Sequence, residues 1–233
     1  LTVSLNLVNG YMGEFSLAHA GFMAVGAYTA ALLTMKVLPM AAYPALFPLA
    51  VLAGGIVAAI MGLIVAVPSF KIRGDYLAII TLAFLMIVKS VIENIDYIGG
   101  PRGIPGIKRL TTLPWVFFWT VATVWMIRNF VYSKYGRGVL SIREDEIASD
   151  LMSVNTKRVK FLAFMLSSFC AGIAGALFAH LLQFISPRVF DIIKTTDVLI
   201  MVYLGGIASI GGSILGATAY TALMELLRPS TVA

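Results

Sequence analysis

Two long stretches without a single charged side chain constrain this chain more than any other feature. Residues 46–67 and 161–182 contain no Asp, Glu, Lys or Arg. A run of about 20 apolar residues is the length that crosses the hydrocarbon core of a bilayer as a helix. The whole chain is 60% hydrophobic and 12% charged, whereas a soluble domain carries about 25% charged residues. The sequence therefore predicts an all-α fold, a polytopic transmembrane helix bundle.

Further apolar runs give the number of expected crossings. The five candidate spans are residues 15–38, 46–67, 76–95, 114–132 and 159–185. Small residues recur at a spacing of four within them, which lets helix backbones approach closely in lipid. We expect a single transmembrane domain over residues 1–233. The chain begins at Leu1 with no basic stretch before it, so a signal peptide is not indicated, and we expect further residues to precede it.

The last apolar stretch, residues 195–227, differs from the others because glycines interrupt it. Residues 204–213 read Leu-Gly-Gly-Ile-Ala-Ser-Ile-Gly-Gly-Ser, and each flanking half is short for a full crossing. Short, Gly-interrupted segments are typical of discontinuous helices that line a transport cavity. Two ordinary helices joined by a tight glycine turn fit the same pattern. The fold prediction therefore includes a discontinuous C-terminal helix pair, with both interpretations open.

The basic residues indicate which side of the membrane each loop faces. The only long polar loop, residues 133–160, carries Lys134, Arg137, Arg143, Lys157, Arg158 and Lys160. Basic loops face the cytoplasm, and alternation then places Lys71 and Arg73 there too. The same alternation places Arg102, Lys108 and Arg109 outside, which disagrees with the rule that basic loops face the cytoplasm. Because the basic residues punctuate apolar spans and form no single patch, the net charge of +6 does not indicate nucleic-acid binding.

The polar loop of residues 133–160 contains a candidate docking helix. Residues 142–152 read Ile-Arg-Glu-Asp-Glu-Ile-Ala-Ser-Asp-Leu-Met, and the pattern predicts one short amphipathic helix with an apolar stripe. The members of the stripe are Ile142, Ile147, Leu151 and Met152. Glu144, Asp145 and Glu146 lie near its start, where the helix dipole favours carboxylates. Such a stripe docks into a groove of a partner, or lies on its own bundle or in the lipid interface.

Residues that could carry enzymatic or metal chemistry are few. The two histidines, His19 and His180, are isolated from each other and from the single cysteine, Cys170, and supply no metal ligand set. No phosphate-binding G-x-x-x-x-G-K-[ST] motif and no His-Glu-x-x-His motif occurs. Lys89 and Glu93 are four residues apart within one span, and we expect a local ion pair. The chain is not expected to be an enzyme or to bind a cofactor.

Five ordered segments carry a resemblance to a known family. The segment 135–150, Tyr-Gly-Arg-Gly-Val-Leu-Ser-Ile-Arg-Glu-Asp-Glu-Ile-Ala-Ser-Asp, continues through 152–159 and resembles the ATPase-coupling loop of branched-chain amino acid ABC transporter permeases of the LivM type. Other parts of the chain match further signatures of that family. They are residues 10–28 near the start, residues 74–84 and 99–106 in the middle, and residues 184–187 with 204–217 near the end. The resemblance extends over essentially the whole chain.

The resemblance implies a heteromeric importer. Its expected partners are a second, LivH-like permease subunit, two ATPase subunits that bind ATP and Mg²⁺, a periplasmic or lipid-anchored substrate-binding protein, and membrane lipid. The expected location is the plasma (inner) membrane of a bacterium or archaeon. The resemblance implies one cytoplasmic coupling helix, moved by the ATPases, with coupling residues Ile142, Arg143, Glu144, Asp145, Glu146, Ala148, Ser153 and Asn155.

The translocation path is the least determined part of the site. Broken-helix ends and glycine turns expose backbone dipoles for a zwitterion, so the expected path residues are Ser16, His19, Gly205, Gly206, Gly211 and Gly212. For His19 and His180 alike, a structural histidine with satisfied hydrogen bonds is the favoured interpretation, and His19 is kept as a path candidate beside it.

The chain departs from the family's usual residues at several positions. Ser153 stands where Gly is usual, and because Ser lacks easy access to positive φ, we expect a different turn there. Glu14 replaces a common Gln, and Arg102 a small polar residue, which bears on the substrate. A urea or short-amide permease of the same superfamily is the alternative function, and a stand-alone secondary transporter is a third.

Overall fold

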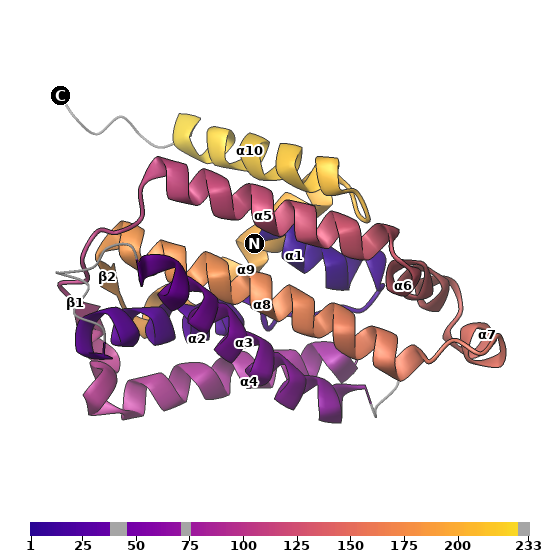
Figure 1. Cartoon of the computed structure of the whole chain (residues 1–233), viewed down its shortest axis with the longest axis horizontal. Coiled ribbons are helices and arrows are strands. Elements are labelled where there is room, and N and C mark those ends of the chain that lie inside the picture. Colours follow the sequence, from indigo (N-terminus) through magenta and orange to yellow (C-terminus); the bar gives the residue numbers. More distant parts are fainter. Residues whose placement is uncertain (38–45, 71–75, 228–233) are drawn as a thin grey trace.

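The computed structural model of the chain describes residues 1–37, 46–70 and 76–227 and is an all-α bundle (Figure 1). Its only strands within these residues are two segments of two residues each, β1 (Ile104–Pro105) and β2 (Phe184–Ile185), paired antiparallel. The predicted fold class is confirmed. Lys71 and Arg73, which the topology prediction places in the cytoplasm, lie outside the described residues.

The helices follow the predicted apolar runs closely. The N-terminal elements are α1 (Thr2–Asn6), the π-helix η1 (Leu7–Tyr11), α2 (His19–Leu32), the π-helix η2 (Leu33–Val37), α3 (Phe47–Ser69) and α4 (Tyr76–Asn94). The later helices are α5 (Leu113–Tyr132), α6 (Lys134–Glu144), α7 (Glu146–Leu151), α8 (Thr156–Leu182), α9 (Ile192–Gly205) and α10 (Ile210–Leu226). Three short 3₁₀ turns are η4 (Asp96–Ile98), η5 (Gly100–Arg102) and η6 (Pro187–Val189).

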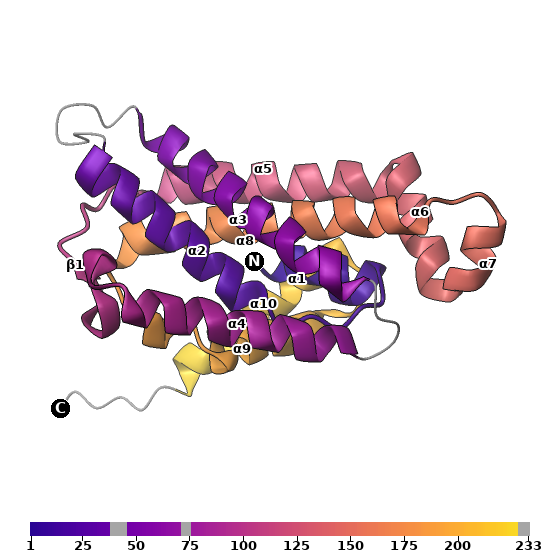
Figure 2. The same ribbon diagram turned by 90° about the horizontal axis from the view of Figure 1, so that it is seen from below.

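Helices α2, α3 and α8 form the centre of the bundle, as the turned view shows (Figure 2). Small residues fill their contacts: Ala27, Ala58 and Ala171 are all fully buried. Large apolar side chains instead cover the outside, for example Ile60 of α3 and Ile79 of α4, which are 51% and 63% exposed. An interior of small residues inside an apolar surface is the arrangement expected of helices packed in lipid.

Three helices among the described residues are long and apolar enough to cross a membrane, namely α3, α4 and α8. A fourth crossing is added if α9 and α10, which meet the criterion only together, count as one broken span. The predicted span 114–132 is present as helix α5 but is not among the three. Its polar residues, Arg128 and Asn129 among them, lower its hydropathy.

The first predicted span, residues 15–38, begins later than expected. Helix α2 starts only at His19, after a non-helical segment of residues 12–18, and residue 38 lies outside the described residues. In this segment the Leu17 N–H donates to Thr81 Oγ1 over 3.0 Å, and Thr195 Oγ1 donates to the Leu17 carbonyl over 3.3 Å. Helices α4 and α9 thus satisfy backbone groups that an earlier helix turn would have used.

The interrupted C-terminal stretch forms the predicted pair of helices, α9 and α10, with a bend of 119° at the break between them. Their connection, residues 206–209, contains Gly206 and Ala208, both with positive φ. The helices have 14 and 17 residues, so each is short of a full crossing on its own.

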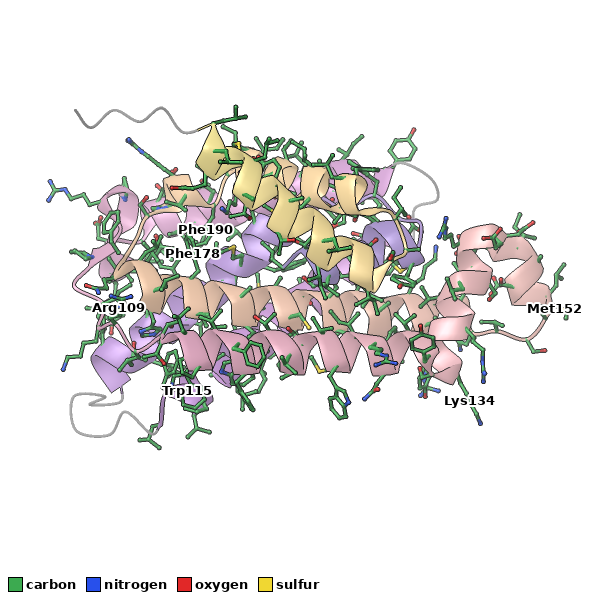
Figure 3. The ribbon with its side chains drawn as sticks, turned by 90° about the horizontal axis from the view of Figure 1, so that it is seen from above. Arg109, Trp115, Lys134, Met152, Phe178 and Phe190 are labelled. Atoms are coloured by element: carbon green, nitrogen blue, oxygen red, sulfur yellow. The ribbon has the colours of Figure 1, made fainter. Side chains whose placement is uncertain are left out.

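The two ends of the bundle differ in character. In both ribbon views β1 lies at one end and α6 and α7 lie at the other (Figures 1 and 2). At the β1 end lies the glycine-rich loop 99–106. Its Gly103 has positive φ and packs so closely on β2 that a Cβ there would lie 2.9 Å from the carbonyl carbon of Ile185. Figure 3 places Arg109 at the end of the molecule opposite Lys134.

Candidate functional site

The predicted docking helix of residues 142–152 is two helices. Helix α6 ends at Glu144, Asp145 adopts an extended conformation with φ −159°, and α7 begins at Glu146. The prediction of one continuous helix is therefore wrong. The break occurs because the Asp145 carboxylate accepts hydrogen bonds from the N–H groups of Ile147 and Ala148, over 2.8 and 3.0 Å, and so starts a new helix.

The break divides the predicted apolar stripe into a buried and an exposed part. Ile142 is only 5% exposed and belongs to the core. Ile147, Leu151 and Met152 are 63%, 82% and 80% exposed. Met152 lies at the outer tip of this end of the molecule in Figure 3. Three large apolar side chains on a capped helix that projects from the bundle form a surface suited to a protein groove.

Ser153 corrects a second expectation. Its φ is +62°, so this serine adopts the left-handed conformation that was expected to be difficult for it and that glycine adopts most easily. The Ser153 N–H donates to the Asp150 carbonyl over 3.2 Å, and the Val154 N–H donates to the Ser149 carbonyl over 3.2 Å. These bonds close the C-terminus of α7. A β-carbon at positive φ strains the backbone.

The remaining predicted coupling residues have distinct surroundings. The Asn155 side chain caps α8 by accepting from the Arg158 N–H over 3.0 Å. Glu144 and Ala148 are exposed. The side chain of Arg143 packs on Gly13, whose φ is +73°. Glu146 is bound by Lys160, with 2.9 Å between Oε2 and Nζ.

The two polar path candidates from the first predicted span lie together at the beginning of α2. Ser16 and His19 are both fully buried. The Ser16 N–H donates to Asn9 Oδ1 over 3.2 Å, and His19 Nε2 lies 2.9 Å from Ser167 Oγ on α8. His19 Nδ1 and Asn9 Nδ2 are buried without a hydrogen-bond partner among the described residues. His19 is therefore only half satisfied.

The four glycine candidates surround the α9–α10 connection. Gly205 and Gly212 pack directly on each other's backbone, while a Cβ on Gly206 or Gly211 would meet nothing within 4 Å. Asn6 of α1 holds this connection: its Nδ2 donates to the Ser209 carbonyl over 3.0 Å and to Ser213 Oγ over 2.6 Å. Its Oδ1 accepts from the Ala208 N–H over 3.0 Å. The connection is thus bonded to another helix.

A cavity of about 270 Å³ lies between α1, α5, α8 and α10, with Thr2, Ser4 and Ser213 among its lining residues. None of the six predicted path residues lines it. The path candidates therefore form two separate groups, one at the start of α2 and one at the α9–α10 connection. Neither group contributes a residue to the lining of this cavity.

Two further charged or polar predictions can be compared with the structure. Lys89 pairs with Asp191 over 2.8 Å, so the expected Lys89–Glu93 pair is wrong. The partner comes from the start of α9, which sequence spacing cannot reveal. His180 is a structural histidine, as predicted: Nδ1 lies 3.0 Å from the Lys108 carbonyl oxygen and Nε2 lies 3.4 Å from Thr34 Oγ1.

Sequence reasoning missed Asn6, Ser167 and Lys160 as organising residues. From the sequence, Lys160 is only one of the six basic residues of the loop 133–160 that indicate the topology. A lysine at the start of an otherwise apolar run is a signal in itself, because a charge near membrane depth needs a partner. Asn6, a carboxamide within an apolar segment, carries the same signal.

The chain matches a known protein family over nearly its whole length. Residues 1–231 match the family model described as "Branched-chain amino acid transport system / permease component". No solved structure matches the chain.

Three curated relatives carry the LivM name. The high-affinity branched-chain amino acid transport system permease proteins LivM of Escherichia coli and Salmonella typhimurium are each 33% identical over 98% of this chain and 60% of their own length. The probable branched-chain amino acid transport permease protein LivM of Methanocaldococcus jannaschii is 27% identical over 77% of this chain and 55% of its own length. The chain thus spans about 60% of the length of the first two.

Proposed function

The chain belongs to the family of permease components of branched-chain amino acid transport systems, and we propose that it is the transmembrane permease subunit of an ATP-driven importer for leucine, isoleucine and valine. In this proposal it forms the translocation path together with a second permease subunit in the plasma membrane of a bacterium or archaeon. ATP and Mg²⁺ bind to separate ATPase subunits, and a substrate-binding protein delivers the amino acid on the outside.

The observation that carries the proposal is the exposed apolar tip of α7. Ile147, Leu151 and Met152 stand out from the end of the bundle on a helix that is capped at both ends. Burying such a tip in a partner removes its apolar surface from water, which favours association. Asp145 holds the tip's first turn in place, so little order has to be gained on docking.

Docking at this tip supplies a mechanism for transport. The ATPase subunits close on ATP and displace α7, and the bundle shifts between inward-facing and outward-facing states. Nucleotide shifts this equilibrium only through the difference in its affinity for the two states. The coupling residues of α6 and α7 then transmit force, and the path residues near His19 and Gly205 respond to it.

Cross-linking tests the docking step. Cys170 is the only cysteine and is buried, so a cysteine introduced at the surface is labelled selectively. In the complex that co-purifies with this chain from its host membrane, Leu151→Cys is expected to cross-link to an ATPase subunit. Arg102→Cys, exposed at the opposite end, serves as the matched control and is expected not to.

Uptake tests the substrate. Proteoliposomes holding the complex, with ATP inside and the binding protein outside, are expected to take up leucine, with isoleucine and valine competing. Competition by urea or acetamide instead would assign the superfamily's amide branch. Uptake that continues without any ATPase subunit would refute the proposal and indicate a secondary transporter.

A further inference from the structure

Lys160 is a buried cation held by two carboxylates. Its side chain is 6% exposed, and its Nζ lies 2.7 Å from Glu14 Oε1 and 2.9 Å from Glu146 Oε2. The ring of Phe70 lies on another side, with its centroid 5.7 Å from Nζ. A buried ammonium group is stable only with such partners, because removing one leaves a charge without compensation.

The three charged residues come from three different parts of the chain. Glu146 is the first residue of α7, Lys160 lies near the beginning of α8, and Glu14 lies in the non-helical segment between η1 and α2. They surround a polar cavity of about 250 Å³ that is also lined by Gly13 and Arg143. Lys160 is therefore the residue through which α7 is bonded to the segment that leads into α2.

The same segment has a second attachment to α8. Glu14 is bound to Lys160, and His19 is bound to Ser167. In an α-helix, residues seven apart lie about 10 Å apart along the axis and about 20° apart around it, so both attachments use one face of α8. An extended chain from residue 14 to 19 can reach up to about 17 Å, so it spans this separation without strain.

The segment is also bonded to the outer helices of the bundle. Leu17, between the two attachments, exchanges hydrogen bonds with Thr81 of α4 and Thr195 of α9. Thr195 Oγ1 also accepts from the Ala20 N–H over 3.3 Å. A displacement of residue 14 therefore reaches backbone groups that α4 and α9 hold, next to the path candidates Ser16 and His19.

We propose that Lys160 is the positioning residue that transmits the movement of α7 to residues 14–19 and so to the start of α2. The inference rests on the proposed function, in which ATPase subunits move α7. When α7 shifts, Lys160 either follows Glu146 and pulls Glu14 with it or loses one of its two carboxylates. Because the second alternative leaves a buried charge poorly compensated, the three groups move together.

The test separates ATP hydrolysis from transport. In the reconstituted complex, Lys160→Met is expected to lower the number of leucine molecules taken up per ATP hydrolysed by about tenfold, because the bonded connection to Glu14 is lost. Lys157→Met removes an exposed lysine from the same helix and is expected to leave this ratio unchanged. An unchanged ratio in Lys160→Met, or an equal loss in both variants, would overturn the inference.

Variants at Glu14 keep the test valid if Lys160→Met assembles poorly. Glu14→Gln retains an oxygen that accepts from Lys160 and is expected to keep the ratio within about twofold of the unmodified complex. Glu14→Leu removes the acceptor and is expected to lower the ratio about fivefold or more. A Glu14→Leu complex that transports with the unmodified ratio would contradict the role of Lys160.

The pair Glu14→Leu and Glu146→Leu adds a coupling measurement. If both carboxylates act through Lys160, the double variant is expected to lose less than the product of the two single losses. Independent, multiplicative losses would count against the shared role. A wild-type complex that transports without ATP would refute the proposed function instead, so the two failures are distinct.

Discussion

Gly26 of α2 lies directly on Gly172 of α8, so closely that a Cβ on Gly26 would come within 2.5 Å of the Gly172 Cα. On its other side Gly172 faces α3, where its own Cβ would lie 2.5 Å from the Ala58 Cβ. The backbones of α2, α3 and α8 thus pack directly against one another around Gly172. Such contacts replace the hydrophobic effect as the source of helix association in lipid.

This contact predicts that added methyl groups destabilise the bundle. Gly26→Ala and Gly172→Ala are each expected to lower the free energy of unfolding by about 1–3 kcal/mol, because the backbones must separate. Thermal unfolding of the purified protein in detergent measures the change. Gly211→Ala is the control, since a Cβ there meets nothing within 4 Å and the backbone does not need positive φ. Equal stability of all three variants would contradict the packing.

The positive φ of Ser153 predicts a stabilising substitution. Ser153→Gly is expected to raise the free energy of unfolding by about 1 kcal/mol, because glycine adopts the left-handed conformation without strain. Ser153→Val is expected to lower it, since a β-branched side chain is least tolerated there. The measurement is again thermal unfolding, and a stabilising Ser153→Val would show that the turn is not the one described.

The capping of α7 predicts a local change without global unfolding. Asp145→Ala is expected to cost about 1 kcal/mol in the stability of α7, because two N–H groups lose their acceptor. Hydrogen exchange of the Ile147 and Ala148 amides reports it directly. Asp145→Asn keeps an acceptor oxygen and is expected to keep the amides protected. Equal protection in Asp145→Ala would mean that the cap does not form.

The bonds of Asn6 predict a strong effect of a small substitution. Asn6→Ala leaves the Ala208 N–H without its acceptor, at an expected cost of about 1–3 kcal/mol for that unsatisfied group, whereas the Ser209 carbonyl still accepts from Ser213. Asn94→Ala removes an exposed carboxamide that bonds to Ser90 of its own helix, and it is expected to change stability by less than about 0.5 kcal/mol. Limited proteolysis at residues 206–209 is expected to accelerate only in Asn6→Ala, and an intact connection there would contradict the prediction.

Much of the fold was predictable because its signals are local. Span length and hydropathy fix where α3, α4, α5 and α8 occur, and glycine spacing marks the break between α9 and α10. The start of α2 was predicted too early because Thr81 and Thr195, far away in the sequence, hold Leu17 outside the helix. Local apolarity carries no information about such bonds.

The candidate site was predictable as a region but not in its connections. The sequence identifies the loop of residues 133–160 and its acidic residues, but it predicts Asp145 as a charge near the start of one helix, whereas Asp145 is the cap that divides two helices. An Asp before a short apolar run is a readable cap signal. The Lys160–Glu14 pair joins residues 146 positions apart, and only the tertiary structure brings them together.

The attachment of the α9–α10 connection to α1 has a consequence for biosynthesis. The Asn6–Ser213 bond closes a loop of 207 positions, so its donor enters the membrane long before its acceptor has been translated. Until α10 leaves the ribosome, the Asn6 carboxamide must be satisfied by water, lipid headgroups or the insertion machinery. Helix α10 therefore supplies, late in synthesis, the partner that the Asn6 carboxamide of α1 has lacked until then.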